Sequence, residues 1–276
     1  MSDLVVTSAA NPRFKRIRSL LHSARERRGE GASVLEGIHL LDSWLLHHAW
    51  GAQPVLEIVL AQRGLVCGEI RDIIERTGIA PMIVQDRLFD SLGTMPSPAP
   101  VLAVVKTPQP DLPARIEEDT VVLDRIQDPG NVGAILRSVA AAGIGRVITT
   151  AQTAWCWSPK VLRAAMGGHF SLSIHESQAW PAIVGLMRVP VAGALAHGGA
   201  SLYECDLTAP CVWVFGNEGD GLSGEIEQRL DWRLTIPQAS QVESLNVAAA
   251  AAICLFEQRR QRLAPQGARV IPVPVG

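Results

Sequence analysis

Short apolar runs alternate with amphipathic stretches along most of the chain. A run of four to eight apolar residues predicts a buried strand, whereas apolar residues three and four apart predict a helix. In residues 1–106 the predicted strands are 33–37, 55–60, 81–84 and 101–105. The predicted helices are 12–28, 38–48, 68–77 and 86–92, the first of which is opened by Asn11-Pro12 and ended by Gly29.

The same alternation restarts near residue 118. The predicted strands there are 120–123, 146–149, 191–195, 212–215 and 233–236. The predicted helices are 132–142, 158–166 and a last helix from Val247, which opens with ten consecutive apolar residues. Strands separated by helices predict an α/β fold with a parallel sheet covered on both faces. A helix that is apolar all round belongs at the centre of the domain or in a subunit interface.

Six prolines between Met95 and Arg115 divide the chain into two parts. Proline at this density disfavours helix and stiffens the backbone, so residues 107–117 are the predicted linker. The prediction is therefore a smaller first domain, residues 1–106, and a larger second domain, residues 118–264. Residues 265–276 contain several Pro and Gly residues and are predicted to form a flexible tail.

The composition is that of a globular protein. Of the 276 residues, 47% are hydrophobic and 19% are charged, which supports a well-buried core. No stretch reaches the roughly 20 apolar residues of a membrane span, and the first residues lack a leader pattern, so we expect a cytoplasmic protein. The five cysteines show neither the spacing of a zinc site nor a disulfide framework, so we expect no metal.

The formal net charge is −2, so composition alone gives no support to nucleic-acid binding. A local excess of cations exists in residues 1–30, where seven Lys and Arg residues stand against three Asp and Glu residues. Four of these cations on the predicted first helix are Arg13, Lys15, Arg16 and Arg18. They form either an RNA-binding surface or an ordinary solvated helix face, and the sequence leaves both open.

The first of three polar blocks runs from Leu123 to Arg137, where a predicted strand ends. Within it, Asp128-Pro129-Gly130-Asn131 predicts a turn, with Asn131 as the N-cap of the next helix. That helix turns an apolar stripe inward, and Arg137 lies on the opposite face. An exposed arginine is ordinary, so this block by itself assigns no function to Arg137.

The second block, Phe215 to Ser223, has three glycines within six residues, so a ligand can approach its backbone closely. Its spacing matches no phosphate-binding motif, and its carboxylates would repel phosphate. S-adenosylmethionine, which is cationic at sulfur, fits better, and a hairpin-like turn is the alternative. The third block comprises Ile236-Pro237 and Glu243 to Val247, in which Ser244 and Asn246 are also candidate helix caps.

Taken in this order, the three blocks resemble the motifs of the SpoU (TrmH) branch of the SPOUT RNA methyltransferases. The resemblance spans roughly residues 120–262 and includes Ser158 to Gly168, while Asn11-Pro12 and Leu35-Glu36-Gly37 resemble the family's N-terminal substrate-binding domain. It implies a homodimer, a parallel-sheet catalytic domain with a deep trefoil knot, and a smaller L30e-like α/β domain. The implied reaction is 2′-O-methylation of a ribose in RNA, with S-adenosylmethionine as the methyl donor.

The resemblance also implies roles for individual residues. Those at the reacting centre are Asn131, Arg137, Ser244 and Asn246, with Glu218 as support for its loop. Those around the methyl donor are Leu195, Gly216, Asn217, Ile236, Leu245 and again Asn246. The candidate RNA contacts are Arg13, Lys15, Arg16, Arg18, Glu36 and Arg163. Because a guanidinium has a pKa above about 12, we expect Arg137 to clamp a phosphate and stabilise a developing alkoxide rather than act as a base.

Three functions stay open at this stage. An N-terminal domain favours 23S rRNA as the substrate, because minimal tRNA enzymes of the family often lack one, and 2′-O-methylation of tRNA is the first alternative. A non-catalytic RNA-binding protein of the same fold is the second, which the intact motif residues argue against. No dinucleotide fingerprint follows a strand, which disfavours an oxidoreductase. The chain departs from the family pattern at Ala99-Pro100 and at Gln238, where relatives often carry Gln-Gly and Met.

Overall fold

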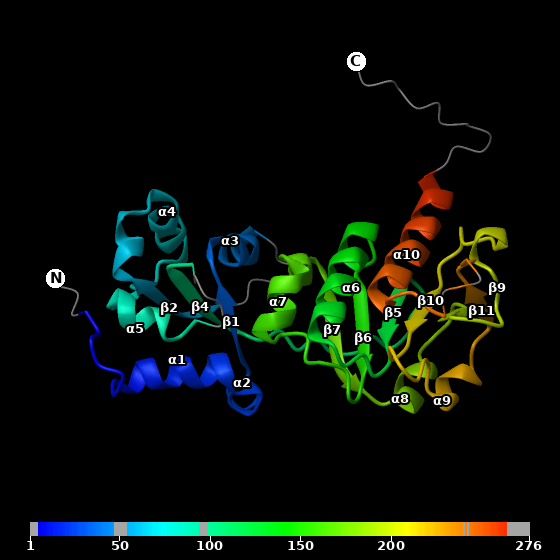
Figure 1. The fold of residues 1–276 in the computed structure, drawn as a ribbon, viewed down its shortest axis with the longest axis horizontal. Helices are drawn as coiled ribbons and strands as arrows, with labels where there is room; N and C mark the ends of the chain where they lie inside the picture. The colour runs from blue at the N-terminus through cyan, green and yellow to red at the C-terminus, as the bar shows by residue number, and fades with distance from the viewer. Residues whose placement is uncertain (1–4, 47–53, 94–98, 240, 242, 264–276) are drawn as a thin grey trace, which may run out of the picture.

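The computed structural model describes residues 5–46, 54–93, 99–239, 241 and 243–263. Two lobes follow one another along the longest axis of the molecule, and each is built around its own sheet (Figure 1). The end of the predicted helix 38–48 and the whole of the predicted tail 265–276 lie outside the described residues.

The N-terminal lobe contains a four-stranded mixed sheet with the order β1-β4-β2-β3. Strand β4 is antiparallel to β1 and β2, and β2 is parallel to β3. The strands are β1 (Ala32–Glu36), β2 (Val55–Ala61), β3 (Met82–Val84) and β4 (Val101–Lys106). The helices are α1 (Pro12–His22), α2 (Ala24–Glu30), α3 (Ile38–Leu46), α4 (Gly68–Thr77) and α5 (Asp86–Asp90), with a short 3-10 helix, η1 (Gln62–Val66).

The C-terminal lobe contains a seven-stranded sheet with the order β7-β6-β5-β10-β8-β11-β9. All of its described pairings are parallel. The strands are β5 (Thr120–Leu123), β6 (Arg146–Thr150), β7 (Ser173–Gln178), β8 (Val191–Leu195), β9 (Ala200–Ser201), β10 (Val212–Phe215) and β11 (Trp232–Thr235). The helices are α6 (Pro129–Ala142), α7 (Pro159–Ala165), α8 (Trp180–Val184), α9 (Gly224–Glu227) and α10 (Val247–Leu263), with 3-10 helices η2 (Gly168–Ser171) and η3 (Leu202–Glu204).

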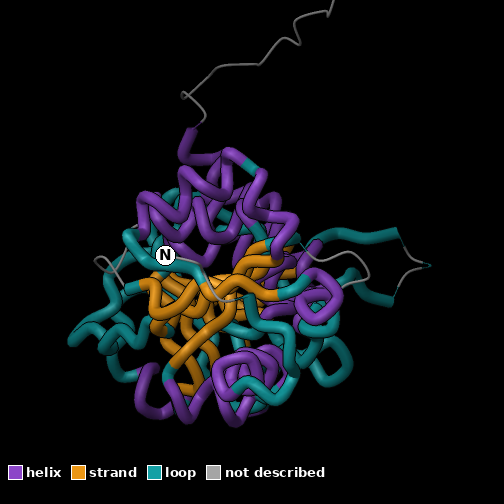
Figure 2. The backbone as a smooth tube through the Cα atoms, turned by 90° about the vertical axis from the view of Figure 1, so that its left-hand side faces the viewer, coloured by secondary structure: helices purple, strands orange, loops and turns teal. Residues whose placement is uncertain are grey.

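Viewed along the long axis, helices lie above and below the strands (Figure 2). Apolar side chains fill the space between them, and strands β5 and β10 at the centre of the large sheet are buried along their whole length. The predicted α/β fold with a parallel sheet is confirmed. Short or polar segments were beyond the prediction: β7, β9, α8 and α9 lack a long apolar pattern.

The predicted basic helix 12–28 is wrong in one respect, because the structure divides it into α1 and α2. The break lies at Ser23, whose backbone is extended with φ −116° and ψ 113°. The Ser23 hydroxyl accepts a hydrogen bond from the Glu26 N–H and so caps α2. A serine inside a basic run was the available signal for two helices.

The predicted start of α6 is also corrected. The helix begins at Pro129, and Asp128 rather than Asn131 is its N-cap. Asp128 Oδ1 accepts a hydrogen bond of 2.9 Å from the Asn131 N–H. Proline suits the first helical position because its missing N–H would have no partner there. The side chain of Asn131 is therefore free of capping and available to other partners.

Aromatic side chains join the two lobes. Trp44 of α3 packs edge to face against Trp157 and Phe170, with ring centroids 6.4 Å and 5.4 Å apart. Beside them, Arg163 of α7 forms an ion pair with Glu36 at the end of β1. The N-terminal lobe is thus packed against α7 as well as being tethered through the chain.

The predicted linker, residues 107–117, contains no helix or strand longer than a single bridge in its described backbone. Its Thr107 N–H donates to the Gly31 carbonyl of the first lobe. Ile116 is fully buried and exchanges backbone hydrogen bonds with Leu186 and Arg188 of the second lobe. No helix in the described part of the chain is long and apolar enough to cross a membrane.

His169 lies in the joint between the lobes, and the burial of its imidazole should make the stability of the chain depend on pH. Its side chain is fully buried next to Trp157, and Nε2 donates to the Cys156 carbonyl at 2.7 Å. Burial lowers the pKa of His169 from 6.5 to about 4. Because the unfolded state then binds the proton more tightly, the free energy of unfolding falls as pH drops from 6.5 towards 4. Above pH 6.5 both states are neutral and His169 contributes no pH dependence.

A pKa difference of that size between the folded and unfolded states corresponds to about 3 kcal/mol in the free energy of unfolding. We expect urea titrations at pH 7 and pH 4 to show a larger loss of stability for the wild-type chain than for His169→Gln, by about that amount. Glutamine keeps an N–H for the Cys156 carbonyl but cannot take up the proton. Equal losses in the two proteins would show that His169 does not titrate in this way.

Candidate functional site

A cavity opens at the carboxyl ends of three neighbouring strands, β10, β8 and β11. Because these strands are parallel and adjacent, their ends meet at one edge of the sheet, where ligands bind in open α/β sheets. The N-terminus of α10 closes one side. The lining residues are Ala194, Leu195, Ala196, Phe215, Gly216, Asn217, Glu218, Gly219, Gly221, Ile236, Gln238, Ser244, Leu245, Val247 and Ala250.

The structure brings together most of the residues predicted for the methyl donor. Leu195 comes from the end of β8, Gly216 and Asn217 follow β10, and Ile236 follows β11. Leu245 reaches the cavity from just before α10. Asn246, the sixth predicted residue, is not among the lining residues and makes its contacts on α6 and α10 instead.

The loop after β10 is a tight turn closed by Asn217 and Gly221, whose backbones exchange two hydrogen bonds of 2.9 Å and 3.0 Å. The Asn217 Oδ1 accepts from the N–H groups of Gly219 and Asp220. Gly216 is required sterically, since a Cβ there would lie 2.4 Å from the Gly221 carbonyl carbon. The second motif is therefore both of the predicted alternatives, a hairpin-like turn and a loop that lines the cavity.

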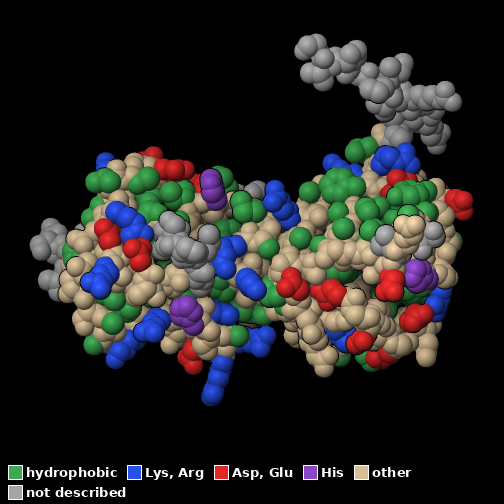
Figure 3. All heavy atoms as spheres, viewed as in Figure 1, with side chains coloured by type: hydrophobic (Ala, Val, Ile, Leu, Met, Phe, Trp, Pro, Cys, Tyr) green, Lys and Arg blue, Asp and Glu red, His purple; other side chains and the backbone are tan. Residues whose placement is uncertain are grey.

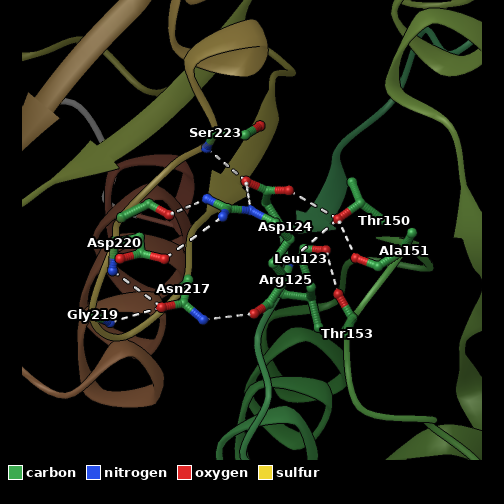
Figure 4. Close-up of polar contacts among 11 residues, drawn as sticks. Leu123, Asp124, Arg125, Thr150, Ala151, Thr153, Asn217, Gly219, Asp220 and Ser223 are labelled. Carbon is green, nitrogen blue, oxygen red and sulfur yellow. Dashed lines mark hydrogen bonds and ion pairs between the residues drawn. The ribbon is translucent and has the colours of Figure 1, made fainter.

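Asp124 anchors this loop to the first motif (Figure 4). Its carboxylate is buried and accepts hydrogen bonds from the Thr150 hydroxyl at 2.9 Å and the Ser223 N–H at 2.8 Å. Next to it, Arg125 adopts the left-handed region with φ 56°, and its carbonyl accepts from the Asn217 amide. A strained non-glycine residue persists only where its surroundings hold it, which these bonds do.

Sequence reasoning missed both Asp124 and Arg125 as site residues. The available signal was a pair of opposite charges directly after the buried strand β5, at the strand end where polar groups position ligands. The pattern could not show that the partners of Asp124 come from residues 150 and 223, far apart in the sequence.

A polar chain connects the three motifs at the mouth of the cavity. Asn131 Nδ2 donates to Glu218 Oε1 at 2.8 Å, and Asn131 Oδ1 accepts from Asn246 Nδ2 at 2.9 Å. Asn246 Oδ1 in turn accepts from the N–H groups of Ala248 and Ala249. Both ends fix the amide orientations, because a carboxylate only accepts and a backbone N–H only donates. The prediction of Asn246 as a helix cap is confirmed by these two bonds.

Arg137 and Ser244 are the other two residues predicted for the reacting centre. Arg137 is exposed on α6, six residues beyond Asn131, or about 9 Å along the helix axis. Its backbone packs closely on Gly168, where a Cβ would lie 3.1 Å from the Arg137 Cα. Ser244 is exposed and lines the cavity. The inward stripe of α6 is confirmed: Val132, Ile135, Leu136 and Val139 are fully buried.

The predicted RNA contacts fall into three groups. Arg13 and Arg16 are bound to carboxylates, since both form ion pairs with Glu57 and Arg16 also pairs with Glu30. Lys15 and Arg18 are exposed on α1. The remaining pair, Glu36 and Arg163, are bound to each other at the joint between the lobes and line a second cavity there.

Further basic residues of α2 also have protein partners. Arg27 is buried and donates to the carbonyls of Leu20 and Leu21. The guanidinium groups of Arg27 and Arg28 both lie over the Trp155 ring of the second lobe. Part of the basic run therefore serves the fold, and the exposed cations on the N-terminal lobe are fewer than the sequence suggests.

The last helix has a mixed environment. On α10, Ala251, Cys254 and Leu255 are buried, and the helix packs against α6. Phe256 is 45% exposed on another face of the same helix. One face of α10 is therefore internal, as expected for a central helix. The other face is uncovered, as expected for a helix in a subunit interface. Within the described residues, no group of His, Cys, Asp and Glu side chains could hold a metal ion.

Comparison with known proteins identifies the family of the chain. The model of the SpoU rRNA Methylase family matches residues 119–256. An uncharacterised tRNA/rRNA methyltransferase of Synechocystis is 32% identical over 95% of this chain and 96% of its own length. The 23S rRNA (uridine(2479)-2′-O)-methyltransferase of Streptomyces viridochromogenes is 30% identical over 93% of this chain and 92% of its own.

The fold agrees as well. The crystal structure of the SpoU methyltransferase AviRb from Streptomyces viridochromogenes, in complex with AdoMet, superposes with a TM-score of 0.81 and 28% identity. The match covers 92% of this chain and 99% of that one. Fold, cavity and motifs thus define an RNA methyltransferase that uses S-adenosylmethionine. The chain belongs to the SpoU rRNA methylase family, and the resemblance seen in the three motifs is confirmed.

Proposed function

We propose that this chain transfers the methyl group of S-adenosylmethionine to a ribose 2′-hydroxyl in 23S rRNA. The observation that carries the proposal is the polar chain from Glu218 through Asn131 to Asn246, which joins all three family motifs at one cavity. The Streptomyces viridochromogenes relative named as a 23S rRNA 2′-O-methyltransferase matches nearly the whole chain, which favours rRNA over tRNA.

The cavity fits the donor. Its apolar side chains, among them Leu195, Ile236 and Leu245, suit an adenine ring, and the backbone of Gly216 forms part of the cavity wall. Bound there with Asn217 and Asn246 nearby, S-adenosylmethionine would supply an activated methyl group on its sulfonium.

The chemistry required of the protein is alignment and management of one proton. Arg137 binds an RNA phosphate and stabilises the alkoxide that develops on the ribose, because its guanidinium keeps its charge. Asn131 and Asn246 hold the ribose side of the site in place, and Ser244 provides a hydroxyl at the cavity wall. Glu218 supports the loop through Asn131 rather than acting as the base.

The proposal includes a substrate-binding role for the N-terminal lobe. In the view of Figure 3, Lys and Arg side chains gather along the lower edge of that lobe, whereas Asp and Glu side chains gather on the C-terminal lobe. Lys15 and Arg18 form one candidate RNA surface. Arg13 and Arg16, which are paired with carboxylates, belong to the same surface. Glu36 and Arg163 contribute at the joint.

The remaining architectural expectations belong to the same proposal. Residues 1–106 form the L30e-like substrate domain, 107–117 the linker and 118–264 the catalytic domain, with a trefoil knot around the cavity. The uncovered face of α10 near Phe256 suits the interface of a homodimer. The expected cytoplasmic location belongs here too, because the rRNA substrate is found in that compartment.

The test is incubation of the protein with methyl-labelled S-adenosylmethionine and separate pools of unmodified 23S rRNA, 16S rRNA and tRNA. Alkaline hydrolysis then maps the label, since a 2′-O-methylated linkage resists alkali. We expect an alkali-resistant labelled dinucleotide from 23S rRNA. Label in the tRNA pool alone would replace rRNA by tRNA as substrate. No label in any pool, alongside donor binding, would favour the non-catalytic RNA-binding protein.

The polar chain predicts how substitutions at Asn131 and Glu218 change kcat, singly and together. In Asn131→Asp, a second carboxylate faces Glu218 in place of an N–H donor, so the loop after β10 separates from α6. We expect kcat to fall by roughly 10- to 100-fold, as for loss of a hydrogen bond to a charged group. Adding Glu218→Gln supplies a new N–H donor and should restore most of kcat. A double variant as slow as Asn131→Asp alone would indicate that Asn131 acts on the substrate itself.

A further inference from the structure

A second cavity lies in the joint between the two lobes, and we call it the joint cavity. Its volume is about 500 Å³, within the range of pockets that bind small ligands. The first lobe contributes residues 36–40, from the end of β1 to the start of α3, and the second lobe contributes Arg163 and Met166 at the end of α7. Among the described residues, the joint cavity has no lining residue in common with the donor cavity.

The lining of the joint cavity combines apolar side chains with hydrogen-bonding groups. Ile38 and Met166 are among its apolar residues. Glu36 and Arg163 pair with each other, so their charges offset, and Glu69 adds a negative charge. A carboxylate disfavours a phosphate but accepts hydrogen bonds from amino groups. The lining therefore fits a neutral group with apolar faces and hydrogen-bonding edges, which describes a nucleobase.

Met166 is the least expected residue of this lining. It directly follows α7 with φ 48°, in the left-handed region, where Gly or Asn usually ends a helix. The residue is 58% exposed, so its burial within the chain offsets little of the backbone strain. A strained and exposed methionine at a cavity wall indicates a partner that covers it. The flexible thioether of methionine packs favourably on aromatic rings, and a nucleobase offers such a ring.

The joint cavity lies close to the predicted reacting centre. Met166 is two residues before Gly168, where an added Cβ would lie 3.1 Å from the Arg137 Cα. Because consecutive Cα atoms are about 3.8 Å apart, the backbone of Met166 lies within roughly 12 Å of Arg137. An RNA strand bound at Arg137 can reach the cavity within a few nucleotides, since stacked bases repeat about every 3.4 Å. Sequence-specific RNA recognition mostly uses bases that are unpaired and splayed out.

We propose that the joint cavity binds one unpaired base of the RNA substrate, within a few nucleotides of the methylated ribose, and that Met166 packs against that base. This inference rests on the proposed function, because it places RNA at Arg137. An apolar side chain of a partner protein fits the lining less well, since it offers no donor to the carboxylate of Glu69.

The experiment is a double-mutant cycle between the protein and the RNA. Once the label has been mapped to one nucleotide, short fragments of that RNA carry a single abasic site at each of the three positions on either side of it. Fluorescence anisotropy gives the Kd of each fragment for the full-length wild type and for Met166→Asn, with S-adenosylhomocysteine present. We expect one abasic position to raise the Kd of the wild type by about 10-fold, as for loss of a base that stacks on a side chain. On Met166→Asn the intact fragment should bind about 3- to 10-fold more weakly, and the same abasic site should raise Kd by less than about 3-fold.

Asparagine suits the left-handed backbone at residue 166, so urea titrations should show this variant to be at least as stable as the wild type. The control is Val66→Asn, which changes a residue that is 85% exposed and does not line the joint cavity. It should keep the full effect of the abasic site. The inference is wrong if no abasic position weakens binding to the wild type, or if folded Met166→Asn keeps the full effect, and methyl transfer to RNA then still stands. If no RNA is labelled in the first place, the proposed function fails and the inference falls with it.

Discussion

Replacing Arg137 by lysine is expected to lower kcat for methyl transfer by about 100- to 1000-fold, the cost of removing one donor that stabilises a developing oxyanion. Lysine keeps the positive charge but cannot reproduce the planar fork of two parallel N–H donors that grips a phosphate. Arg137 is exposed and lies away from the cavity lining, so the Kd for S-adenosylmethionine should stay the same. The measurement is single-turnover methylation of 23S rRNA with saturating donor, alongside calorimetric donor binding.

The matched control is Arg229→Lys, an exposed arginine of the same lobe that does not line the cavity. Exposed substitutions of this kind usually change stability by less than about 0.5 kcal/mol, so both variants should unfold at the urea concentration of the wild type. An Arg137→Lys enzyme that methylates at the wild-type rate would remove both the phosphate clamp and the alkoxide stabiliser from the mechanism. The active centre would then have to be sought around Asn131 and Ser244.

Much of the fold was predictable because, in the central strands, the run of apolar residues and the polar or Gly residues that follow it predict the same strand bounds. Strands β5 and β10 are buried along their whole length and are followed by Asp124 and Gly216, and their bounds match the prediction, as do those of β8. Strand β7 was not predictable, since Ser173–Gln178 alternates polar residues with few apolar ones. Its pairing with β6 comes from tertiary contacts that a local pattern does not contain.

The site was predictable to a different degree. The position of each motif at a strand end follows from the sequence, and so does the meeting of Gly216 and Ile236, because parallel neighbours align their carboxyl ends. The polar chain through Asn131 was not predictable. It depends on Asp128 taking the N-cap of α6, which leaves the Asn131 amide to bridge two distant loops.

The RNA surface shows the same limit for charge. A run of arginines indicates cations but not their partners, and the structure places carboxylates from β2 and α2 against Arg13 and Arg16. Arg27 is drawn into the fold to cap the carbonyls at the end of α1. Charge patterns therefore predict where a binding surface can lie, while burial and pairing decide which cations are free to form it.

Gly216→Ala is expected to weaken donor binding by roughly 10- to 100-fold, because overpacking a tight site costs about 1–3 kcal/mol and each 1.4 kcal/mol is about tenfold in affinity. A methyl group at residue 216 would lie 2.4 Å from the Gly221 carbonyl carbon, 2.5 Å from its oxygen and 2.5 Å from the Leu222 nitrogen. These are backbone atoms of the turn that Asn217 and Gly221 close, so no flexible side chain can move aside. The turn must open, and it carries Asn217 and Glu218 out of the cavity wall with it.

The control that separates this clash from a general cost of alanine is Gly224, which follows the same loop and does not line the cavity. An added Cβ at Gly224 would meet nothing within 4 Å. Gly224→Ala should therefore bind S-adenosylmethionine within about 3-fold of the wild type, while Gly216→Ala loses about 1–3 kcal/mol of stability, as overpacked sites do. Isothermal titration calorimetry at pH 7.5 without urea measures the donor affinity, and urea titrations measure the stability. Equal donor affinity in the two folded variants would mean that the backbone at Gly216 does not shape the donor site.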